Sequence, residues 1–347
     1  MDDTPRPPRR KRYSGKNPRR FEDKYKEHHP DRYADTVGKV LESGKTPAGM
    51  HVPIMVEECL DALGLSPGQA GVDCTLGYGG HAREILSRIS PGGRLIGLDV
   101  DPLEQPKTEA RLRAAGFDAE AFTAVRSNYA GIRKVLDGLG LEAVDFIFAD
   151  LGCSSMQFDN PARGFTFKVD GPLDMRMNPE RGIAAAEWLA KVKETKLAEV
   201  LLENADEPLA EEIAAALAGR QCPTTKSLVA ALHAVPAVAR LDAERSELTV
   251  RRVFQAIRIA VNEEFSSLDA FMRQLPLCLK PGGRAAILTF HSGEDRRVKR
   301  SFQAGERDGT YSQVSDGVVV ASPEERRNNP RSAPAKLRWA VRAGPLG

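Results

Sequence analysis

Short apolar runs recur along residues 71–151, and segments with helical periodicity follow them. The apolar runs lie at 71–76, 94–100, 120–125 and 144–151, and the periodic segments lie at 81–89, 103–115 and 130–139. The run at 144–151 is apolar at almost every position, which is typical of a strand buried on both faces of a parallel sheet. The pattern predicts strands alternating with helices.

This alternation stops after residue 151 and returns near residue 250. Residues 152–182 are rich in Gly, Pro, Asp and Asn, and residues 185–245 have the pattern of short helices without a strand. An amphipathic segment at 250–279, a strand at 284–291, a helix at 293–303 and a last strand at 336–342 complete the pattern. We therefore predict a doubly wound, Rossmann-like α/β domain at 49–157 and 248–347, with a helical subdomain inserted at 158–247.

Charge is unevenly distributed, although the chain of 347 residues has a formal net charge of only +2. Residues 1–20 contain eight Lys or Arg and two Asp, which leaves 42 basic and 46 acidic residues in the rest. The basic segment has no apolar core, so it is not a secretory signal. We expect residues 1–48 to be a disordered arm. The arm could hold phosphates or simply aid solubility, and composition favours neither.

The cysteines and the apolar runs restrict the class of protein. The five cysteines are scattered and form no C-x-x-C pair, which indicates a reducing cytoplasm rather than a disulfide framework or a zinc site. No run approaches the ~20 apolar residues that span a bilayer. We expect a cytoplasmic protein without a membrane segment and without a metal.

Candidate ligand-binding residues lie where the predicted strands end, because ligands of such sheets bind beyond the carboxyl ends of the strands. The first turn contains Gly77, Gly79 and Gly80, the second strand ends at Asp99, and the fourth ends at Asp150. The spacing Gly77-x-Gly79-x-x-Ala82 also fits a nicotinamide-dependent oxidoreductase. Asp73 and Asp150 favour a sulfonium cation over a pyrophosphate.

Nine segments resemble one known family, the RsmH (MraW) ribosomal RNA methyltransferases. They are H-V-P-I (51–54), D-C-T-L-G-Y-G-G-H (73–81), L-D-V-D-P (98–102), D-L-G-C-S-S (150–155), R-G-F-T-F-K-V-D-G-P-L-D-M-R-M (163–177), F-Q-A-I-R-I-A-V-N (254–262), P-G-G-R (281–284), F-H-S-G-E-D-R-x-V-K (290–299) and N-P-R-S-A-P-A-K-L-R (329–338). Gly293, Val253 and the stretch 206–208 depart from the family pattern, which leaves local packing or RNA contacts open at these positions.

The resemblance implies a class I S-adenosylmethionine-dependent methyltransferase that modifies the N4 amine of a cytidine in the decoding region of 16S rRNA. Its substrate would be the small ribosomal subunit, and the enzyme would be a monomer or homodimer. Matched by position, the donor-binding residues would be Gly79, Gly80, His81, Asp99, Tyr129, Asp150 and Gln157. The alternatives are a methyltransferase acting on DNA or protein, the oxidoreductase above, and a non-catalytic ribosome assembly factor.

An exocyclic amine is a poor nucleophile, so catalysis needs alignment and hydrogen-bond acceptors. Asp150, the carbonyls of residues 151–153 and, more weakly, Ser154 are the candidates for that role. Cys153 could instead be a nucleophile for C5 methylation. We favour a bystander role for Cys153, because the resembling family has valine at this position in some members.

Candidate RNA-binding residues lie mainly in the predicted insert, because an extruded base needs stacking and basic contacts. Arg163 and Arg176 are the first candidates, and Lys299 extends the basic track, with Arg296 and Arg338 as further possibilities. We expect Phe165 and Phe167 to pack internally, as large apolar side chains usually do. We interpret His81 and His291 as hydrogen-bonding residues rather than metal ligands, because no clustered Cys/His pattern accompanies them.

Overall fold

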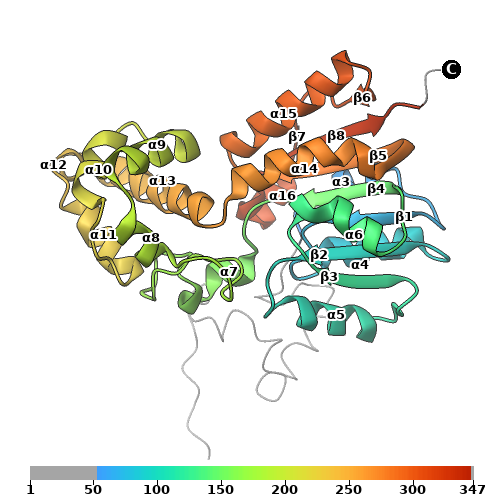
Figure 1. Ribbon diagram of the computed structural model, residues 1–347, viewed down its shortest axis with the longest axis horizontal. Helices are drawn as coiled ribbons and strands as arrows, with labels where there is room; N and C mark the ends of the chain where they lie inside the picture. The colour runs from blue at the N-terminus through green and yellow to red at the C-terminus, as the bar shows by residue number, and fades with distance from the viewer. Residues whose placement is uncertain (1–52, 345–347) are drawn as a thin grey trace, which may run out of the picture. The chain divides into compact units, whose positions relative to one another are not determined.

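The structure is a computed structural model that describes residues 53–344, so the predicted arm at 1–48 lies outside the described residues. Its centre is an eight-stranded sheet with the order β3-β2-β1-β4-β5-β8-β6, and β7 also pairs with β8 (Figure 1). The strands are β1 (Ala70–Asp73), β2 (Arg94–Asp99), β3 (Phe122–Arg126), β4 (Val144–Asp150), β5 (Leu279–Thr289), β6 (Tyr311–Val314), β7 (Val319–Val320) and β8 (Lys336–Arg342).

The strand directions confirm the doubly wound class I arrangement expected from the sequence. Strands β1 to β5 pair in parallel, whereas β8 is antiparallel to β5, β6 and β7. The chain begins the sheet at β1, adds β2 and β3 on one side, and then crosses to add β4 and β5 on the other. The carboxyl ends of β1 and β4 therefore adjoin at the switch point, where ligands of such sheets bind.

Helices cover both faces of the sheet because the strand side chains alternate between two apolar layers. Phe146 and Phe148 of β4 face one layer, whereas Ile147 and Ala149 face the other. Helices α3 (Val56–Leu63), α4 (Gly80–Ile89) and α5 (Gln105–Ala114) contribute to the first layer. Helices α6 (Ile132–Gly138), α14 (Glu264–Cys278) and α15 (Ser292–Arg307) contribute to the second. These two layers explain the continuous apolar run at 144–151.

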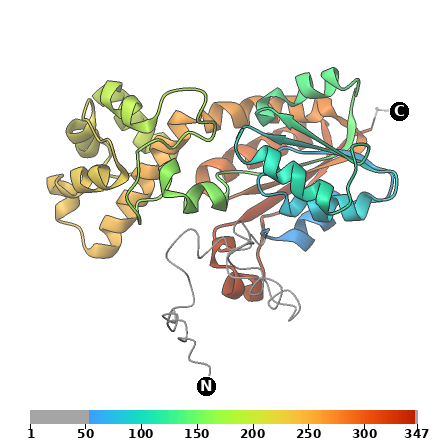
Figure 2. The same cartoon turned by 90° about the horizontal axis from the view of Figure 1, so that it is seen from below.

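The segment after β4 forms a core of its own. It contains α7 (Ser155–Asp159), α8 (Ala185–Lys191), α9 (Glu194–Ala205), α10 (Ala210–Leu217), α11 (Thr225–His233), α12 (Pro236–Ala239) and α13 (Ala243–Val261). Helix α13 contributes Val250, Phe254 and Ile257 to this core, so the boundary at 247/248 that we expected falls inside one helix. In Figures 1 and 2, α13 and α14 lead from this core back to the sheet.

Two parts of the sequence pattern were misinterpreted. The amphipathic segment at 250–279 is two helices, because the chain breaks at Glu263, whose φ of 51° is left-handed. The polar loop expected after residue 303 contains β6, β7 and α16 (Pro323–Asn328). In β6 only Tyr311 and Val314 are buried, and β7 has two residues, so neither strand produces an apolar run.

A buried ion pair attaches the inserted segment to the sheet. Asp101 lies just after β2 and is 1% exposed, and its Oδ2 is 2.8 Å from Arg163 Nη1. The same oxygen accepts a hydrogen bond of 2.9 Å from Gln157 Nε2, and Oδ1 accepts one of 2.9 Å from Leu103 N. Arg163 Nη2 donates to the carbonyls of residues 176 and 177 at 3.0 and 2.8 Å. Every charge in this group is therefore compensated.

We expect Asp101→Ala to lower the free energy of unfolding by about 3–5 kcal/mol, because it leaves the buried Arg163 guanidinium without its carboxylate. Arg126→Ala is the matched control: it breaks an exposed pair with Glu180, and we expect it to cost less than about 1 kcal/mol. Urea denaturation measures both. An Asp101→Ala cost no larger than that of the control would contradict a structural role for the buried pair.

Candidate active site

Three carboxyl groups surround the switch point of the sheet. Asp73 ends β1, Asp99 ends β2 and Asp150 ends β4, so the parallel strands bring them to one edge. Burial is the main reason that the pKa of each is raised, to about 7 for Asp73, about 6 for Asp99 and about 8 for Asp150. Charge repulsion among the carboxylates adds to this effect. The site thus favours a cation or hydroxyl groups as its ligand.

Asp99 organises the first turn as well as facing the site. Its Oδ2 accepts a hydrogen bond from Gly77 N and its Oδ1 accepts one from Asp101 N, both at 2.8 Å. A carboxylate has further lone pairs after these two bonds, so Asp99 can still accept from the hydroxyls of a ribose. This geometry is compatible with the role that the resemblance implies.

The glycines of the first turn are required mainly by internal packing. A Cβ on Gly79, whose φ is 84°, would lie 2.7 Å from Thr108 Cγ2. A Cβ on Gly80 would lie 3.0 Å from the ring of Pro53. These glycines are candidate ligand-binding residues in the sequence, but α5 and the segment before α3 approach Gly79 and Gly80. A Cβ on Gly77, whose φ is 47°, would make only ordinary contacts, at 3.7 Å from the Thr75 carbonyl oxygen and 4.0 Å from Ser154 Cβ.

His81 and Asp150 form a pair at the edge of this turn. His81 is 7% exposed, its Nε2 lies 2.9 Å from the Ile54 carbonyl, and its Nδ1 lies 3.6 Å from Asp150 Oδ2. The ring also contacts Phe148 at 4.7 Å between centroids. The other carboxylate oxygen, Asp150 Oδ1, is buried and has no hydrogen-bond partner within residues 53–344. A buried polar atom of this kind needs a ligand or a water to be stable.

The remaining predicted donor-binding residues support the site rather than face it. The Tyr129 hydroxyl donates to the Glu264 carbonyl at 3.4 Å, and the Tyr129 ring packs on Phe271. Gln157 joins Asp101 to a capping box in which Ser154 Oγ accepts from Gln157 N and Gln157 Oε1 accepts from Ser154 N. Ser154 is therefore the N-cap of α7. Asp150 remains as the candidate acceptor for a ligand, because its Oδ1 has no hydrogen-bond partner within the described residues.

A cavity of about 630 Å³ begins at Val100, the residue after Asp99, and continues past Ser127 and Asn128 to the inserted segment, where Arg176 and Met177 line it. A nucleoside fits this volume. The buried carboxyls and the unpartnered oxygen of Asp150 suit a cation such as the sulfonium of S-adenosylmethionine.

The predicted RNA-binding residues have different surroundings. Arg163 is 9% exposed and its guanidinium is used within the fold, as described above. Arg176 pairs with both oxygens of Asp174, at 2.8 and 2.7 Å, and lines the cavity. Lys299 is exposed on α15. The structure thus makes Arg163 a positioning residue, while Arg176 and Lys299 stay predicted RNA contacts.

The further basic and aromatic candidates are mostly engaged within the fold. Arg338 is 9% exposed and pairs with Asp295 at 2.6 Å, and Arg296 pairs with Asp206 at 3.3 Å. Phe165 is buried in the core of the inserted segment, and Phe167 packs against Phe254 with 5.3 Å between ring centroids. The expectation of internal packing for these two aromatics is therefore confirmed.

Several residues of the site were missed in the sequence. Asp101 is the second acidic residue of the L-D-V-D-P motif, but the sequence indicates a ligand-binding role only for the first, Asp99. A group of charged side chains lies near Cys153 and consists of Arg258, Glu264 and Glu294. The sequences of their separate segments do not predict that they meet. Arg258 donates to both oxygens of Glu264, at 2.8 and 3.0 Å. Burial raises the pKa of the Cys153 thiol to about 12 although the Arg258 charge lowers it, so Cys153 is a weak candidate nucleophile.

The departures from the family pattern have local explanations. A Cβ on Gly293 would lie 2.5 Å from the Phe265 ring, so Phe265 occupies the space of a larger residue there. Val253 is fully buried in the apolar core of the inserted segment. Asp206 ends α9 in a left-handed conformation, and Glu207 is buried and accepts a hydrogen bond from Leu209 N. None of these positions borders the three carboxyls.

Comparison with known proteins identifies the family of the chain. The model of the MraW methylase family matches residues 48–343. Ribosomal RNA small subunit methyltransferase H 1 of Lachnoclostridium phytofermentans is 49% identical, over 96% of this chain and 93% of that protein. The protein of the same name from Agathobacter rectalis is 48% identical, over 96% and 97%. Ribosomal RNA small subunit methyltransferase H 2 of Alkaliphilus metalliredigens is 47% identical, over 96% and 97%. The chain therefore belongs to the MraW methylase family of S-adenosylmethionine-dependent ribosomal RNA methyltransferases.

Proposed function

We propose that the chain methylates the N4 amine of a cytidine in the decoding region of 16S rRNA, in the small ribosomal subunit. The observation that favours an amine is the chemical state of two neighbouring side chains. Asp150 has a buried carboxylate oxygen without a hydrogen-bond partner within residues 53–344, and burial keeps the Cys153 thiol protonated. Methylation at C5 needs a thiolate nucleophile, whereas an amine needs only an acceptor and alignment. The names of the relatives support ribosomal RNA of the small subunit as the substrate.

Asp150 is the proposed catalytic acceptor for the amine. Its Oδ1 is buried without a hydrogen-bond partner within residues 53–344, and the carbonyls of residues 151–153 are further proposed acceptors at the same turn. The donor supplies an electrophilic methyl group when it is bound. The protein's contribution is to hold the amine in line with that methyl and to favour a nitrogen whose lone pair has left the ring. Ser154 is less suited, because its hydroxyl already caps α7.

The proposal extends to the surroundings of the enzyme. Arg176 and Lys299 are proposed to contact the RNA backbone, since Arg176 lines the cavity and Lys299 is exposed.

Among the described residues, the longest apolar stretches of helix are too short or too polar to cross a membrane. We further propose that the enzyme acts in the cytoplasm, where small subunits are assembled, as a monomer or homodimer.

The raised pKa values of the three carboxyls make donor binding depend on pH. Near pH 6 Asp73 and Asp150 are largely protonated and Asp99 is about half protonated, and a bound sulfonium favours the ionised forms, so donor binding releases protons. We therefore expect the Kd for S-adenosylmethionine to fall between pH 6 and 8, by up to about tenfold per pH unit for each proton released. Calorimetry in buffers of different ionisation enthalpy measures both quantities.

S-adenosylhomocysteine is the matched control for this linkage, because its sulfur is neutral and its contacts are otherwise the same. Its Kd should depend less on pH, and Asp150→Asn should reduce the difference between the two ligands. Equal pH dependence for both ligands in the wild-type protein would be incompatible with a sulfonium held by these carboxyls.

The function is tested by methyl transfer from labelled donor to small subunits from a strain that lacks this protein, followed by nucleoside analysis. We expect N4-methylcytidine at one rRNA position. The Cys153→Val variant should give the same product at a rate within a few-fold of the wild type, whereas Asp150→Ala should slow transfer by about 100-fold or more. C5-methylcytidine, lost in Cys153→Val, would overturn the proposal, and label in DNA or protein alone would identify another substrate.

A further inference from the structure

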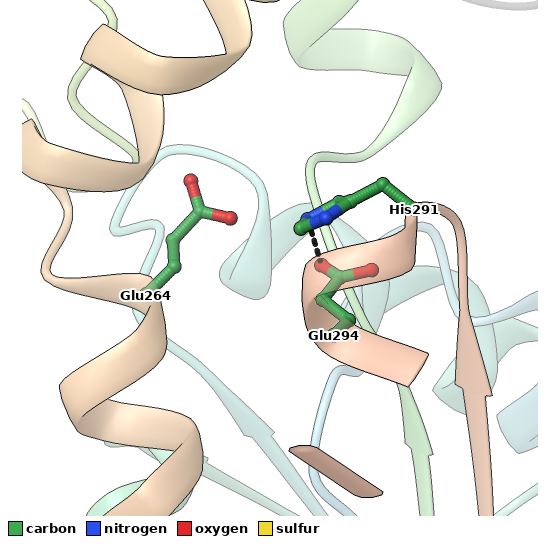
Figure 3. A group of neighbouring side chains, drawn as sticks. All are labelled: Glu264, His291 and Glu294. Carbon is green, nitrogen blue, oxygen red and sulfur yellow. Dashed lines mark ion pairs between the residues drawn. The ribbon is translucent and has the colours of Figure 1, made fainter. Parts of the chain in front are cut away.

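Four ionisable side chains form a second buried cluster at the carboxyl edge of the sheet. Arg258 comes from α13, Glu264 from α14, and His291 and Glu294 from the start of α15. Their side chains are between 4% and 12% exposed. Figure 3 shows Glu264 on one side of the His291 ring and Glu294 on the other. Such a cluster is costly to bury unless its charges balance.

The acidic residues of this cluster lie beside the Arg258 guanidinium and the His291 ring. Burial raises the pKa of Glu294, but contact with His291 and the Arg258 charge outweigh it, so the pKa lies below its ordinary value. Arg258 donates to both oxygens of Glu264 and keeps its charge. The guanidinium thus engages Glu264, whereas Glu294 lies beside the imidazole.

A metal ion is a poor fit to this cluster. Within residues 53–344, Glu264, His291 and Glu294 are the group whose ligand atoms all lie within 4.8 Å of one another. Both oxygens of Glu264 are already hydrogen-bonded to Arg258, so a dication would have to lie beside a guanidinium. Only His291 and Glu294 would remain as uncommitted ligands, which is fewer than a structural or catalytic metal site requires.

Glu294 lies beside the ring of His291. Its Oε2 accepts a hydrogen bond of 2.8 Å from Phe290 N, and its Oε1 lies 3.1 Å from His291 Nε2. This is an ion-pair distance without hydrogen-bond geometry, so neither ring nitrogen makes a hydrogen bond within the described part of the chain. The ring packs against Phe265, with 5.7 Å between centroids, and Phe265 in turn lies under the Arg297 guanidinium. Because Nε2 faces Glu294, Nδ1 is the nitrogen left to accept a proton.

The Nδ1 atom has no committed partner. It is buried and makes no hydrogen bond within the described part of the chain. It lies 3.2 Å from the position that a Cβ on residue 293 would take, a position that the Phe265 ring fills in this structure. A buried acceptor without a partner is expected where a ligand completes the site.

The cluster adjoins the turn that presents Asp150. Strand β5 pairs with β4, so that Asp150 lies opposite Leu288, and Leu151 N donates to the Leu288 carbonyl at 2.9 Å. His291 follows three residues later. The Glu294 charge also raises the pKa of both Asp150 and Cys153, which indicates that the two clusters share one environment. The imidazole is therefore close to the acceptors proposed for the amine.

We propose that His291 accepts the proton that the target amine loses when it is methylated, and that Glu294 positions the ring for this transfer. This inference rests on the proposed amine methylation. The amine nitrogen forms a bond to the donor methyl as the methyl–sulfur bond breaks, and the electron pair of that bond stays on sulfur. The cationic amine then transfers one proton to Nδ1 of His291, and Glu294 and Glu264 balance the imidazolium until water removes the proton.

The charged or titratable groups around this imidazole come from every neighbouring element. They are Glu294 and Arg297 of α15, Glu264 of α14, Arg258 of α13, Tyr129 before α6, and Asp150 and Cys153 at the end of β4. Arg258 and Arg297 bring positive charge to this site, and the carboxyl groups bring negative charge, so an imidazolium formed by the transfer has counterions beside it.

The test is single-turnover methyl transfer to small subunits with saturating donor. We expect His291→Gln to lower the rate by about 100-fold or more, with the Kd for S-adenosylmethionine unchanged, since general-base groups contribute about 10²–10⁴-fold. The fall in rate towards acid pH should disappear in this variant. Glu294→Gln should lower the rate less and shift the pH profile, because it removes the positioning carboxylate but not the base.

Two controls separate chemistry from folding. His233→Gln, at the exposed end of α11, should leave the rate unchanged. Added imidazole should restore part of the rate of His291→Ala, which a merely structural role would not permit. If the wild type produces N4-methylcytidine and His291→Gln keeps its rate and pH profile, the inference is wrong and the proposed function stands. If the wild type produces none, the proposed function itself fails. A stoichiometric metal in the purified wild type that is lost in Glu264→Gln would also overturn the proton-acceptor role.

Discussion

The buried carboxylate of Asp101 is the interaction on which the rest of this structure depends. It lies just after β2, and it accepts hydrogen bonds from Arg163, Gln157 and its own turn. A buried carboxylate is stable only when it is paired, so the turn of β2 and the first part of the inserted segment must form together. Asp101 N also donates to Asp99, which in turn accepts from the first glycine turn. One charge therefore connects the donor site to the inserted segment.

Arg163 extends this connection to the far side of the cavity. Its guanidinium donates to the carbonyls of residues 176 and 177, and these residues line the cavity beside Val100. Met177 N is in turn held by Asn262, between α13 and α14. The R-G-F…D-M-R-M block, through which the sequence resembles the family, thus has a structural role here: its first arginine, Arg163, fixes the wall of the cavity. The site for the donor is shaped by residues that need not touch it.

The parts of the fold that the sequence predicts are those set by local physics. The strand β4 is apolar along its length because both faces are covered, and Asp99 and Asp150 were found because strand ends define the ligand edge. The break between α13 and α14 was missed because Glu263 is left-handed without being glycine. Strand β6 was missed because it buries only two side chains.

The candidate site was predictable to the same extent. Asp101 acquires its role from Arg163, which lies far away in the chain, and no periodicity records such a contact. Glu264 and Glu294 contact the nearby Arg258 and His291, but the sequence does not show that these two pairs meet. The glycines of the first turn were recognised, but the reason for Gly79 lies in its contact with Thr108. The donor side of the site concentrates carboxyls with raised pKa values, whereas the second cluster pairs Arg258 with Glu264.

The most direct test of this account is the affinity of Arg163→Met for S-adenosylmethionine, measured by calorimetry on protein whose fold is verified by circular dichroism. Arg163 belongs to the inserted segment and is committed to Asp101 and to backbone carbonyls. The account predicts donor binding weakened by about tenfold or more, as expected when a buried ion pair that positions a site is lost. Arg251→Met, which breaks an exposed ion pair with Glu247 on α13, serves as the control. Unchanged donor affinity in folded Arg163→Met would contradict the account, because the donor site would then form without the buried pair.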